Sequence, residues 1–365
     1  MNFGTLHWSY RDFRFMPEEL RTCGPDVLEV YLKENFIPAI PDWFFQEMMR
    51  LRFICLAGNL LEDIPEQISL LVDLETLDVS QNTITLLPRS LGCLRNLTVL
   101  KLSENKLTSL PREIGLLANL EMLDVSNNRL NEIPVELSQC LNLKELIINE
   151  NYLLVRIPNK IFTLPRLVYL SAEGCNLMLL PFAVNLNSLE VLRVFNNNLL
   201  THYPLMLEKF IQPNYDPFTT VKLKRYRDAV YYREIRSDVL QRNLIFPGEL
   251  TTILDRRKTT HNPSSLVENG LRKCYYQSKM SDLLSVLKCW LPRNLYRQLL
   301  HGPVAVCGNN PCSKNIFKEC VLGLIKKQKL AKPAIFSILF CSKLCANLWF
   351  QCNCDVYDEL NWTLV

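Results

Sequence analysis

One short pattern, LxxLxLxxN, recurs along the first part of this chain at a nearly constant interval and restricts what the chain can fold into. It begins at Val27, Leu51, Leu74, Leu97, Leu120, Leu143, Leu167 and Leu189, so neighbouring units start 22 to 24 residues apart. A proline stands six or seven residues after the last position of each unit. A fixed period of this length predicts stacked repeats, because so short a unit can bury its apolar side chains only against its neighbours.

The residue types of each unit predict the role of each position. The central LxL triplet favours a short strand with inward-pointing leucines, and parallel stacking of such strands about 4.8 Å apart would bury a continuous core. We expect these central leucines to be buried: Leu77, Leu100, Leu123 and Leu146. The last position forms a column whose amides can donate to backbone carbonyls: Asn35, Asn59, Asn82, Asn105, Asn128, Asn151 and Asn197, with Cys175 in one unit. The proline suits an extended or 3₁₀ return segment on the opposite side.

These units, as in LETLDVSQNTITLLPRSLGCLRN, resemble the 23-residue repeats of intracellular leucine-rich repeat proteins, LxxLxLxxNxLxxLPxxIxxLxx. The resemblance covers about residues 5–204. It implies an α/β fold class: a leucine-rich repeat solenoid with a curved parallel sheet and a convex side of short 3₁₀ or helical segments. The stretch WSYRDFRFMP, residues 8–17, is interpreted as a degenerate first turn that caps the N-terminal end.

A solenoid of this kind offers a concave sheet whose non-leucine positions face a partner. The candidate partner-binding residues are Tyr31, Phe53, Asp78, Lys101, Asp124, Glu145, Ile147, Tyr169, Arg193 and Phe195. Large apolar side chains flanked by charges suit a protein partner. The alternative is an ordinary solvated surface of mixed character.

Charge and cysteine divide the chain into two regions of different chemistry. Residues 1–212 hold 18 Lys and Arg against 25 Asp and Glu, a net charge of −7, whereas residues 213–365 hold 23 against 12, a net charge of +11. Nine of the 14 cysteines lie in the second region. We predict an N-terminal cap and degenerate repeat over 1–26, eight repeats over 27–212, a basic connecting segment over 213–262 and a Cys-rich module over 263–365.

Two cysteine pairs predict a structural zinc site in that module. Cys307 and Cys312 form a C-x₄-C loop, VCGNNPCSKNIF, and Cys341 and Cys345 form a C-x₃-C pair after an apolar strand. Four thiolates in two close pairs fit a closed tetrahedral zinc site, so the module would be small, helical and zinc-knuckle-like. Four cysteine ligands leave no open position for a catalytic water. The alternative is a set of buried thiols, and Cys352 or Cys354 could replace a member of the second pair.

No segment of the chain predicts a membrane span or a signal peptide. Residues 334–350, AIFSILFCSKLCANLWF, are interrupted by Lys343 and Asn347, and their unbroken apolar part is shorter than the ~20 residues that a span needs. We expect a buried strand there. Because the N-terminus lacks an apolar core after a basic segment, the cysteines predict an intracellular protein, cytoplasmic or nuclear.

The order of motifs in the second region carries a further resemblance. PSSLVENGLRKC, WLPRNLYRQLL, VCGNNPCSKNIF and KPAIFSILFCSKLCAN follow one another as in the C-terminal module of the leucine-rich repeat-containing protein 28 family and, more distantly, of the leucine-rich repeat protein 1 family. The second family binds elongin through a helix and acts as substrate receptor of a cullin ubiquitin ligase. The resemblance implies that Leu266, Gly270, Cys274, Leu291 and Pro292 contact the adaptor and the cullin.

Composition argues against catalysis. The chain of 365 residues has 48% hydrophobic residues, as folded proteins do, but only 11 glycines for phosphate-binding loops and four histidines to serve as general bases. The function predicted first is a non-enzymatic interaction scaffold that binds a protein through the concave face. The ligase adaptor is one alternative. The other is nucleic-acid binding, because Val221–Lys258 interleaves basic and aromatic residues.

Overall fold

A computed structural model describes most of the first 210 residues and parts of the remainder. The described residues are 4–23, 26–181, 188–197, 199–200, 203–210, 232–237, 242–247, 271–272, 295, 305–307, 312, 314–316, 321–327, 335–341, 343–353, 355–359 and 362–364. The chain divides into two compact units. The first holds Met1–Val155, Leu164–Cys175 and Asn185–Asn196, and the second holds Arg156–Thr163, Asn176–Val184 and Asn197–Val365.

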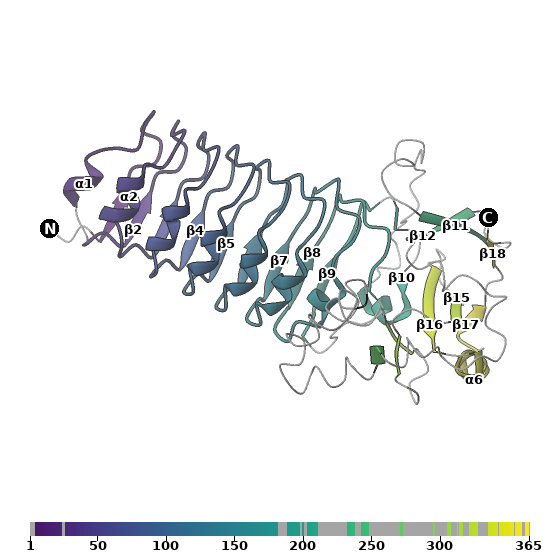
Figure 1. Ribbon diagram of the computed structural model, residues 1–365. Coiled ribbons are helices and arrows are strands. Elements are labelled where there is room, and N and C mark those ends of the chain that lie inside the picture. The colour runs from purple at the N-terminus through teal and green to yellow at the C-terminus, as the bar shows by residue number, and fades with distance from the viewer. Residues whose placement is uncertain are drawn as a thin grey trace. The chain divides into compact units, whose positions relative to one another are not determined.

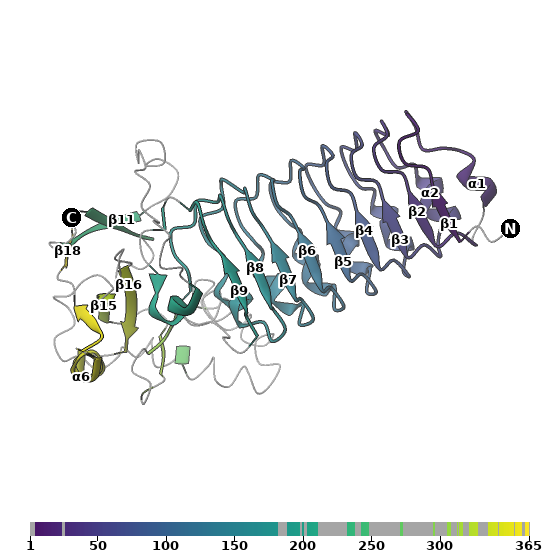
Figure 2. The ribbon, with the colours of Figure 1, turned by 180° about the vertical axis from the view of Figure 1, so that it is seen from behind.

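The first unit is built on a nine-stranded parallel sheet in strict sequence order (Figures 1 and 2). Its strands are β1 (Thr5–His7), β2 (Glu29–Tyr31), β3 (Phe53–Cys55), β4 (Thr76–Asp78), β5 (Val99–Lys101), β6 (Met122–Asp124), β7 (Glu145–Ile147), β8 (Tyr169–Ser171) and β9 (Val191–Arg193). The central leucines stand in register, with Leu100 paired to Leu77 and Leu123. The four expected core leucines are at most 1% exposed, which confirms both the inward triplet and the parallel stacking.

Short helices form the other side of the repeats, as the prolines predicted. They are α2 (Asp42–Glu47), η2 (Glu66–Leu70), η3 (Arg89–Cys93), η4 (Arg112–Leu116) and η5 (Val135–Gln139). Pro65, Pro88 and Pro111 each stand in extended conformation directly before their 3₁₀ helix. Consecutive 3₁₀ helices pack closely. At Gly115 on η4 there is no room for a side chain, since an added Cβ would collide with the carbonyl oxygen of Glu136 on η5. Figures 1 and 2 show these helices opposite the strands, whose outer face we call the concave face.

The asparagine column is confirmed and does more than the sequence predicted. Asn105 Nδ2 donates to the carbonyl oxygens of Val79 at 3.0 Å and Leu102 at 3.1 Å, and its Oδ1 accepts the Ile84 N–H at 3.0 Å. Asn105 therefore satisfies backbone groups both in its own unit and in the unit before it, within the buried core, and the same contacts recur at Asn59, Asn82, Asn128 and Asn151.

Cys175 replaces asparagine in a unit where this position has fewer backbone groups to satisfy. Its thiol donates to the carbonyl oxygen of Ile148 at 3.3 Å. Thiols accept hydrogen bonds weakly, so the backbone N–H that an asparagine Oδ1 would accept needs another partner. The Leu154 N–H instead donates to the carbonyl oxygen of Asn151 at 3.0 Å, a local bond that the longer unit permits.

The N-terminal segment contributes a full strand to the sheet. β1 pairs in parallel with β2, and Asn35 Oδ1 accepts the backbone N–H groups of Arg11 and Phe13. The sheet therefore has nine strands, one more than the eight repeats counted from the pattern. Helix α1 (Leu20–Cys23) follows β1 in the chain.

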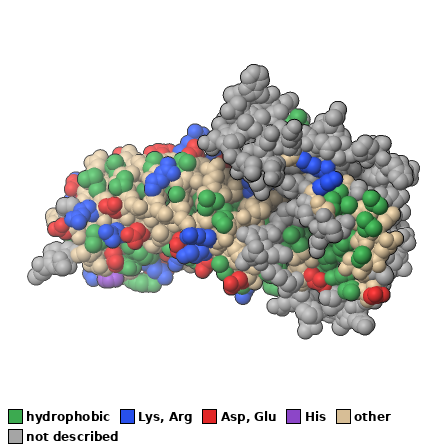
Figure 3. Space-filling model, turned by 90° about the horizontal axis from the view of Figure 1, so that it is seen from below, with side chains coloured by type: hydrophobic (Ala, Val, Ile, Leu, Met, Phe, Trp, Pro, Cys, Tyr) green, Lys and Arg blue, Asp and Glu red, His purple; other side chains and the backbone are tan. Residues whose placement is uncertain are grey.

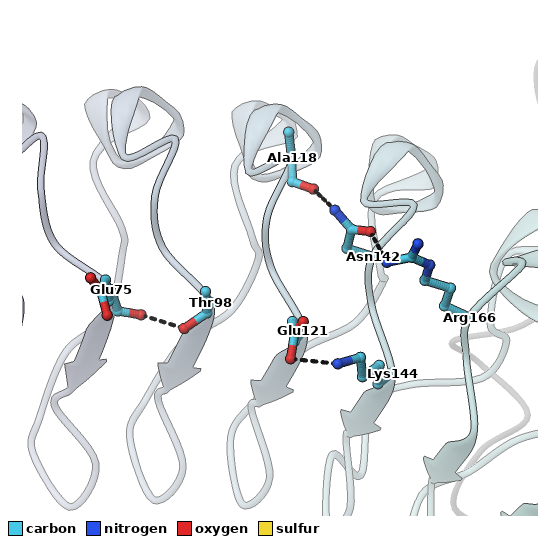
Figure 4. Close-up of polar contacts among 7 residues, drawn as sticks. All are labelled: Glu75, Thr98, Ala118, Glu121, Asn142, Lys144 and Arg166. Carbon is cyan, nitrogen blue, oxygen red and sulfur yellow. Dashed lines mark hydrogen bonds and ion pairs between the residues drawn. The ribbon is translucent and has the colours of Figure 1, made fainter.

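Polar side chains also link neighbouring units at the surface (Figure 4). Asn142 Nδ2 donates to the carbonyl oxygen of Ala118 at 2.9 Å, and its Oδ1 accepts from Arg166 at 2.7 Å. One view of the molecule shows apolar side chains in small groups between both signs of charge (Figure 3).

The described part of the second unit contains three small sheets. They comprise β10 (Tyr203–Pro204), β16 (Ile335–Phe340), β15 (Val321–Lys327) and β17 (Tyr357–Glu359); β12 (Arg242–Pro247), β11 (Tyr232–Ser237) and β18 (Trp362–Leu364); and the hairpin β13 (Ala305–Val306) and β14 (Asn315–Ile316). Helices η6 (Asn159–Thr163), η7 (Leu205–Phe210) and α6 (Lys343–Asn353) also belong to this unit. Among the described residues, no helix has both the length and the apolar character needed to cross a membrane.

The expected buried strand over residues 334–350 is correct only as far as Phe340. From Lys343 the chain forms helix α6 instead. Ala346 is buried and Trp349, Phe350 and Asn353 are half-buried, and this i, i+3, i+4, i+7 spacing is that of one helix face. This spacing is present in the sequence. The apolar strand directly before it made the whole segment look like one strand, so the change from strand to helix periodicity was not predicted.

Candidate metal centre and concave face

The concave face consists of the first and third positions of every strand. In the third position the register aligns Asp78, Lys101 and Asp124 on neighbouring strands β4, β5 and β6. In the first position it aligns Val99, Met122 and Glu145 on β5, β6 and β7. Nine of the ten candidate residues stand at these positions, and Phe195 lies two residues after β9. All ten are half-buried or exposed, so none belongs to the core. Their role in binding stays a prediction.

Two aspartates at the centre of this face are held by the same local motif. Asp78 Oδ1 accepts from the Ser80 backbone N–H at 3.1 Å and from the Ser80 hydroxyl at 2.6 Å. Asp124 and Ser126 repeat these contacts at 2.9 and 2.6 Å. Both contacts fall on one oxygen of each carboxylate, which fixes its orientation. A partner would therefore meet these carboxylates already oriented.

The first three strands carry a stack of aromatic rings on the same face. The ring of Tyr31 lies 4.5 Å from that of His7 and 4.6 Å from that of Phe53, both stacked. The Tyr31 hydroxyl donates to Glu29 Oε2 at 3.3 Å. Burial, and then the carboxylate of Glu29, raise the pKa of Tyr31. His7 was not among the predicted residues, because β1 lacks the LxxLxL pattern and only the pairing of β1 with β2 places His7 on this face.

Four cysteines in the second unit converge, as the zinc prediction required. Cys307 follows β13 and Cys312 precedes β14, so one hairpin supplies the first pair. Cys341 follows β16 directly and Cys345 lies in the first turn of α6, so a strand-to-helix turn supplies the second. Their four Sγ atoms all lie within 4.8 Å of one another.

The spacing of the sulfurs matches a tetrahedral metal site. The Sγ of Cys341 lies 3.4 Å from that of Cys312 and 3.7 Å from that of Cys345. Zinc with four sulfurs at about 2.3 Å separates them by about 3.8 Å, whereas a disulfide joins two sulfurs at about 2.05 Å. The Cys341 N–H donates to Cys307 Sγ at 3.4 Å, as in the outer shell of metal-bound thiolates.

The electrostatics of this cluster favour a cation. Burial, and then the thiol of Cys312, raise the pKa of Cys341 well above its ordinary value. Like charges so close together disfavour ionisation unless a cation lies between them. The residues present thus fit a divalent metal of thiolate preference.

The remaining predicted residues lie either outside the cysteine cluster or outside the described part of the chain. Cys352 is exposed on α6 and is not among the converging four, so it is not the replacement ligand. Cys354 lies outside the described residues, as do the adaptor candidates Leu266, Gly270, Cys274, Leu291 and Pro292. Most of Val221–Lys258 also lies outside them. The ligase and nucleic-acid alternatives therefore stay predictions.

Comparisons with known proteins agree with the repeats. The Leucine rich repeat family model matches residues 74–130. A leucine-rich repeat protein of Leptospira interrogans is 26% identical with a TM-score of 0.42, covering 48% of this chain and 50% of that chain. Internalin C2 of Listeria monocytogenes is 21% identical with a TM-score of 0.44, covering 53% and 80%. A plant peptide hormone receptor is 26% identical with a TM-score of 0.39, covering 45% and 27%.

This chain spans half or less of the length of the first and third of these structures. A search of curated proteins gives no match. The strand register and the family model together identify the first unit as a leucine-rich repeat solenoid.

Proposed function

We propose that this protein is a non-enzymatic scaffold that binds a protein partner through the concave face of its solenoid. The observation that carries the proposal is the contrast between the two faces of each strand. Inward leucines are buried, while the outward positions combine oriented carboxylates, a lysine, apolar side chains and an aromatic stack. Such a mixed surface on a rigid sheet suits protein recognition. The leucine-rich repeat fold typically serves as a binding scaffold.

The test reverses charges on this face without touching the core. Asp78→Lys, Lys101→Glu and Asp124→Lys together should remove the partners that the tagged full chain captures from a cell lysate, identified by mass spectrometry. The melting temperature should change little, because all three side chains are outside the core.

The matched control exchanges charges on the opposite side. Arg112 on η4 and Glu136 on η5 lie 3.8 Å apart, so Arg112→Glu with Glu136→Lys reverses the pair and keeps its net charge. This variant should retain every captured partner. If the control loses the partners and the concave variant keeps them, the binding surface is the convex side and the proposal is wrong.

We infer that Cys307, Cys312, Cys341 and Cys345 hold one structural zinc ion. A hairpin and a strand-to-helix turn each give two thiolates, the arrangement of a closed four-sulfur site with no position for water or substrate. Bound zinc would supply a crosslink between β13–β14 and the β16–α6 turn.

Metal analysis tests this site directly. Protein purified without chelator should hold about one equivalent of zinc. Cys312→Ser should release it and make the region after residue 262 sensitive to protease. The solenoid should stay folded, because its stability comes from contacts between neighbouring repeats.

Cys352→Ser is the control, since this exposed cysteine lies on the same helix as Cys345 but outside the cluster. It should change neither zinc content nor proteolysis. Absence of zinc from the unmodified protein would show that the four residues are free thiols and not metal ligands.

A further inference from the structure

The charges on the concave face specify the chemistry of the partner, an inference that rests on the proposed function. Asp78, Asp124 and Glu145 lie outward on β4, β6 and β7. In the part of the chain that the structure describes, the ion pairs found include none with these three carboxylates. The one basic side chain at an outward position of β4–β7 is Lys101.

Other acidic residues next to these strands are already neutralised from within the solenoid. Glu121 Oε2 pairs with Lys144 Nζ at 2.8 Å, as Figure 4 shows, and Glu75 pairs with Arg52 at 3.5 Å. Among the described residues, the centre of the face thus keeps three carboxylates that form no ion pair and one ammonium group, a net charge of −2. The serine contacts orient two of these carboxylates but leave them charged.

Apolar side chains lie beside these charges. Val99 and Met122 are half-buried in the adjacent column, and the ring of Phe53 ends the aromatic stack on β3. A partner that covers this surface would bury apolar area and bring cations to the carboxylates. A neutral or acidic partner would leave the carboxylates desolvated and unpaired, which is costly.

The strands also fix the length of the partner segment. From β3 to β7 the sheet advances by four strand spacings of about 4.8 Å, or about 19 Å. An extended segment crossing them needs about six residues at about 3.3 Å each, and a helix needs about 13 residues at about 1.5 Å each.

We propose that the concave face binds a basic protein segment whose Lys or Arg side chains pair with Asp78, Asp124 and Glu145. The same segment places an apolar or aromatic side chain against Phe53, Val99 and Met122.

A random library of displayed 16-residue peptides, selected on the full-length protein, tests this proposal. The enriched peptides should carry more Lys and Arg than the input library, together with apolar residues. For the best synthetic peptide, Asp78→Asn, Asp124→Asn and Glu145→Gln together should weaken binding about tenfold. Raised salt should weaken it in the unmodified protein and have less effect in this variant.

The control removes three carboxylates outside the strands. Asp63→Asn, Glu113→Gln and Glu132→Gln change the net charge equally and should leave binding nearly unchanged. A second variant, Phe53→Ala with Met122→Ala, reports whether a peptide uses the concave face at all.

The outcomes separate this inference from the proposed function. Peptides that lose binding in the apolar variant but are neutral or acidic, or are indifferent to the three carboxylates, overturn the basic-segment inference and leave the concave face as the binding surface. A selection that yields no peptide sensitive to either concave variant overturns the proposed function itself.

Discussion

Replacing Asn105 by alanine should destabilise the solenoid far more than its surface area suggests. Its side chain is 8% exposed and satisfies three buried backbone groups, the carbonyls of Val79 and Leu102 and the N–H of Ile84. Alanine would leave the Ile84 N–H without its acceptor, while each carbonyl would lose one of two hydrogen bonds, because Val79 also accepts from Asn82 and Leu102 from Asn128. The change therefore acts on two neighbouring repeats at once.

The size of the effect follows from these contacts. A buried backbone hydrogen bond contributes about 1 kcal/mol net, and a group left unpaired costs more. One unpaired N–H and two lost hydrogen bonds to carbonyls that keep another donor give a loss of about 2–4 kcal/mol in the free energy of unfolding. Asn105→Cys should still lose the acceptor for the Ile84 N–H, because a thiol accepts hydrogen bonds weakly. The Leu154 N–H, in the longer unit before Cys175, bonds to the Asn151 carbonyl instead.

Asn119→Ala is the matched control. Asn119 is exposed and makes a hydrogen bond at 2.9 Å to the carbonyl oxygen of Arg95, which water can replace. Its loss should cost about 0.5 kcal/mol or less. Urea unfolding followed by far-ultraviolet circular dichroism gives both values from the midpoint and slope.

A reduced slope for Asn105→Ala would show that the repeats on its two sides unfold separately. If its loss of stability equals that of Asn119→Ala with the slope unchanged, the asparagine column does not hold the repeats together and the reasoning is wrong.

Three further measurements probe the packing of both units. Leu100→Ala removes a fully buried side chain and should cost about 2–5 kcal/mol in urea unfolding, and a smaller loss would contradict its central place in the core. Gly115→Ala should lower the melting temperature because its Cβ meets the Glu136 carbonyl, whereas Gly4→Ala, with no atom within 4 Å, should not. Burial, and then Glu208, whose carboxylate accepts from the Tyr357 hydroxyl at 2.8 Å, raise the pKa of Tyr357 from 10.0 to about 12. Because the folded pKa is the higher one, this stabilisation is complete below pH 10 and is lost as pH rises through about 12, so Tyr357→Phe should flatten the alkaline loss of stability.

The period of the sequence by itself determined the solenoid, the leucine core and the asparagine column. A repeat imposes the same local environment many times, so one unit's pattern predicts its neighbours' burial, as Leu77, Leu100 and Leu123 show. The spacing of the two cysteine pairs likewise predicted that four sulfurs meet, because each short loop already holds two of them together.

Only the tertiary structure decided which residues join across long sequence separations. β1 carries no leucine pattern and is defined by its hydrogen bonds to β2, which bring His7 onto Tyr31. The pairing of β10 with β16 joins Tyr203 to Phe336, 133 residues later. The same holds for charge, because the sequence alone does not distinguish a carboxylate that forms an ion pair from one that forms none. The register pairs Glu121 with Lys144, whereas Asp78 and Asp124 face outward and form no ion pair within the described part of the chain. That difference depends on which side chains the stacked strands bring within reach.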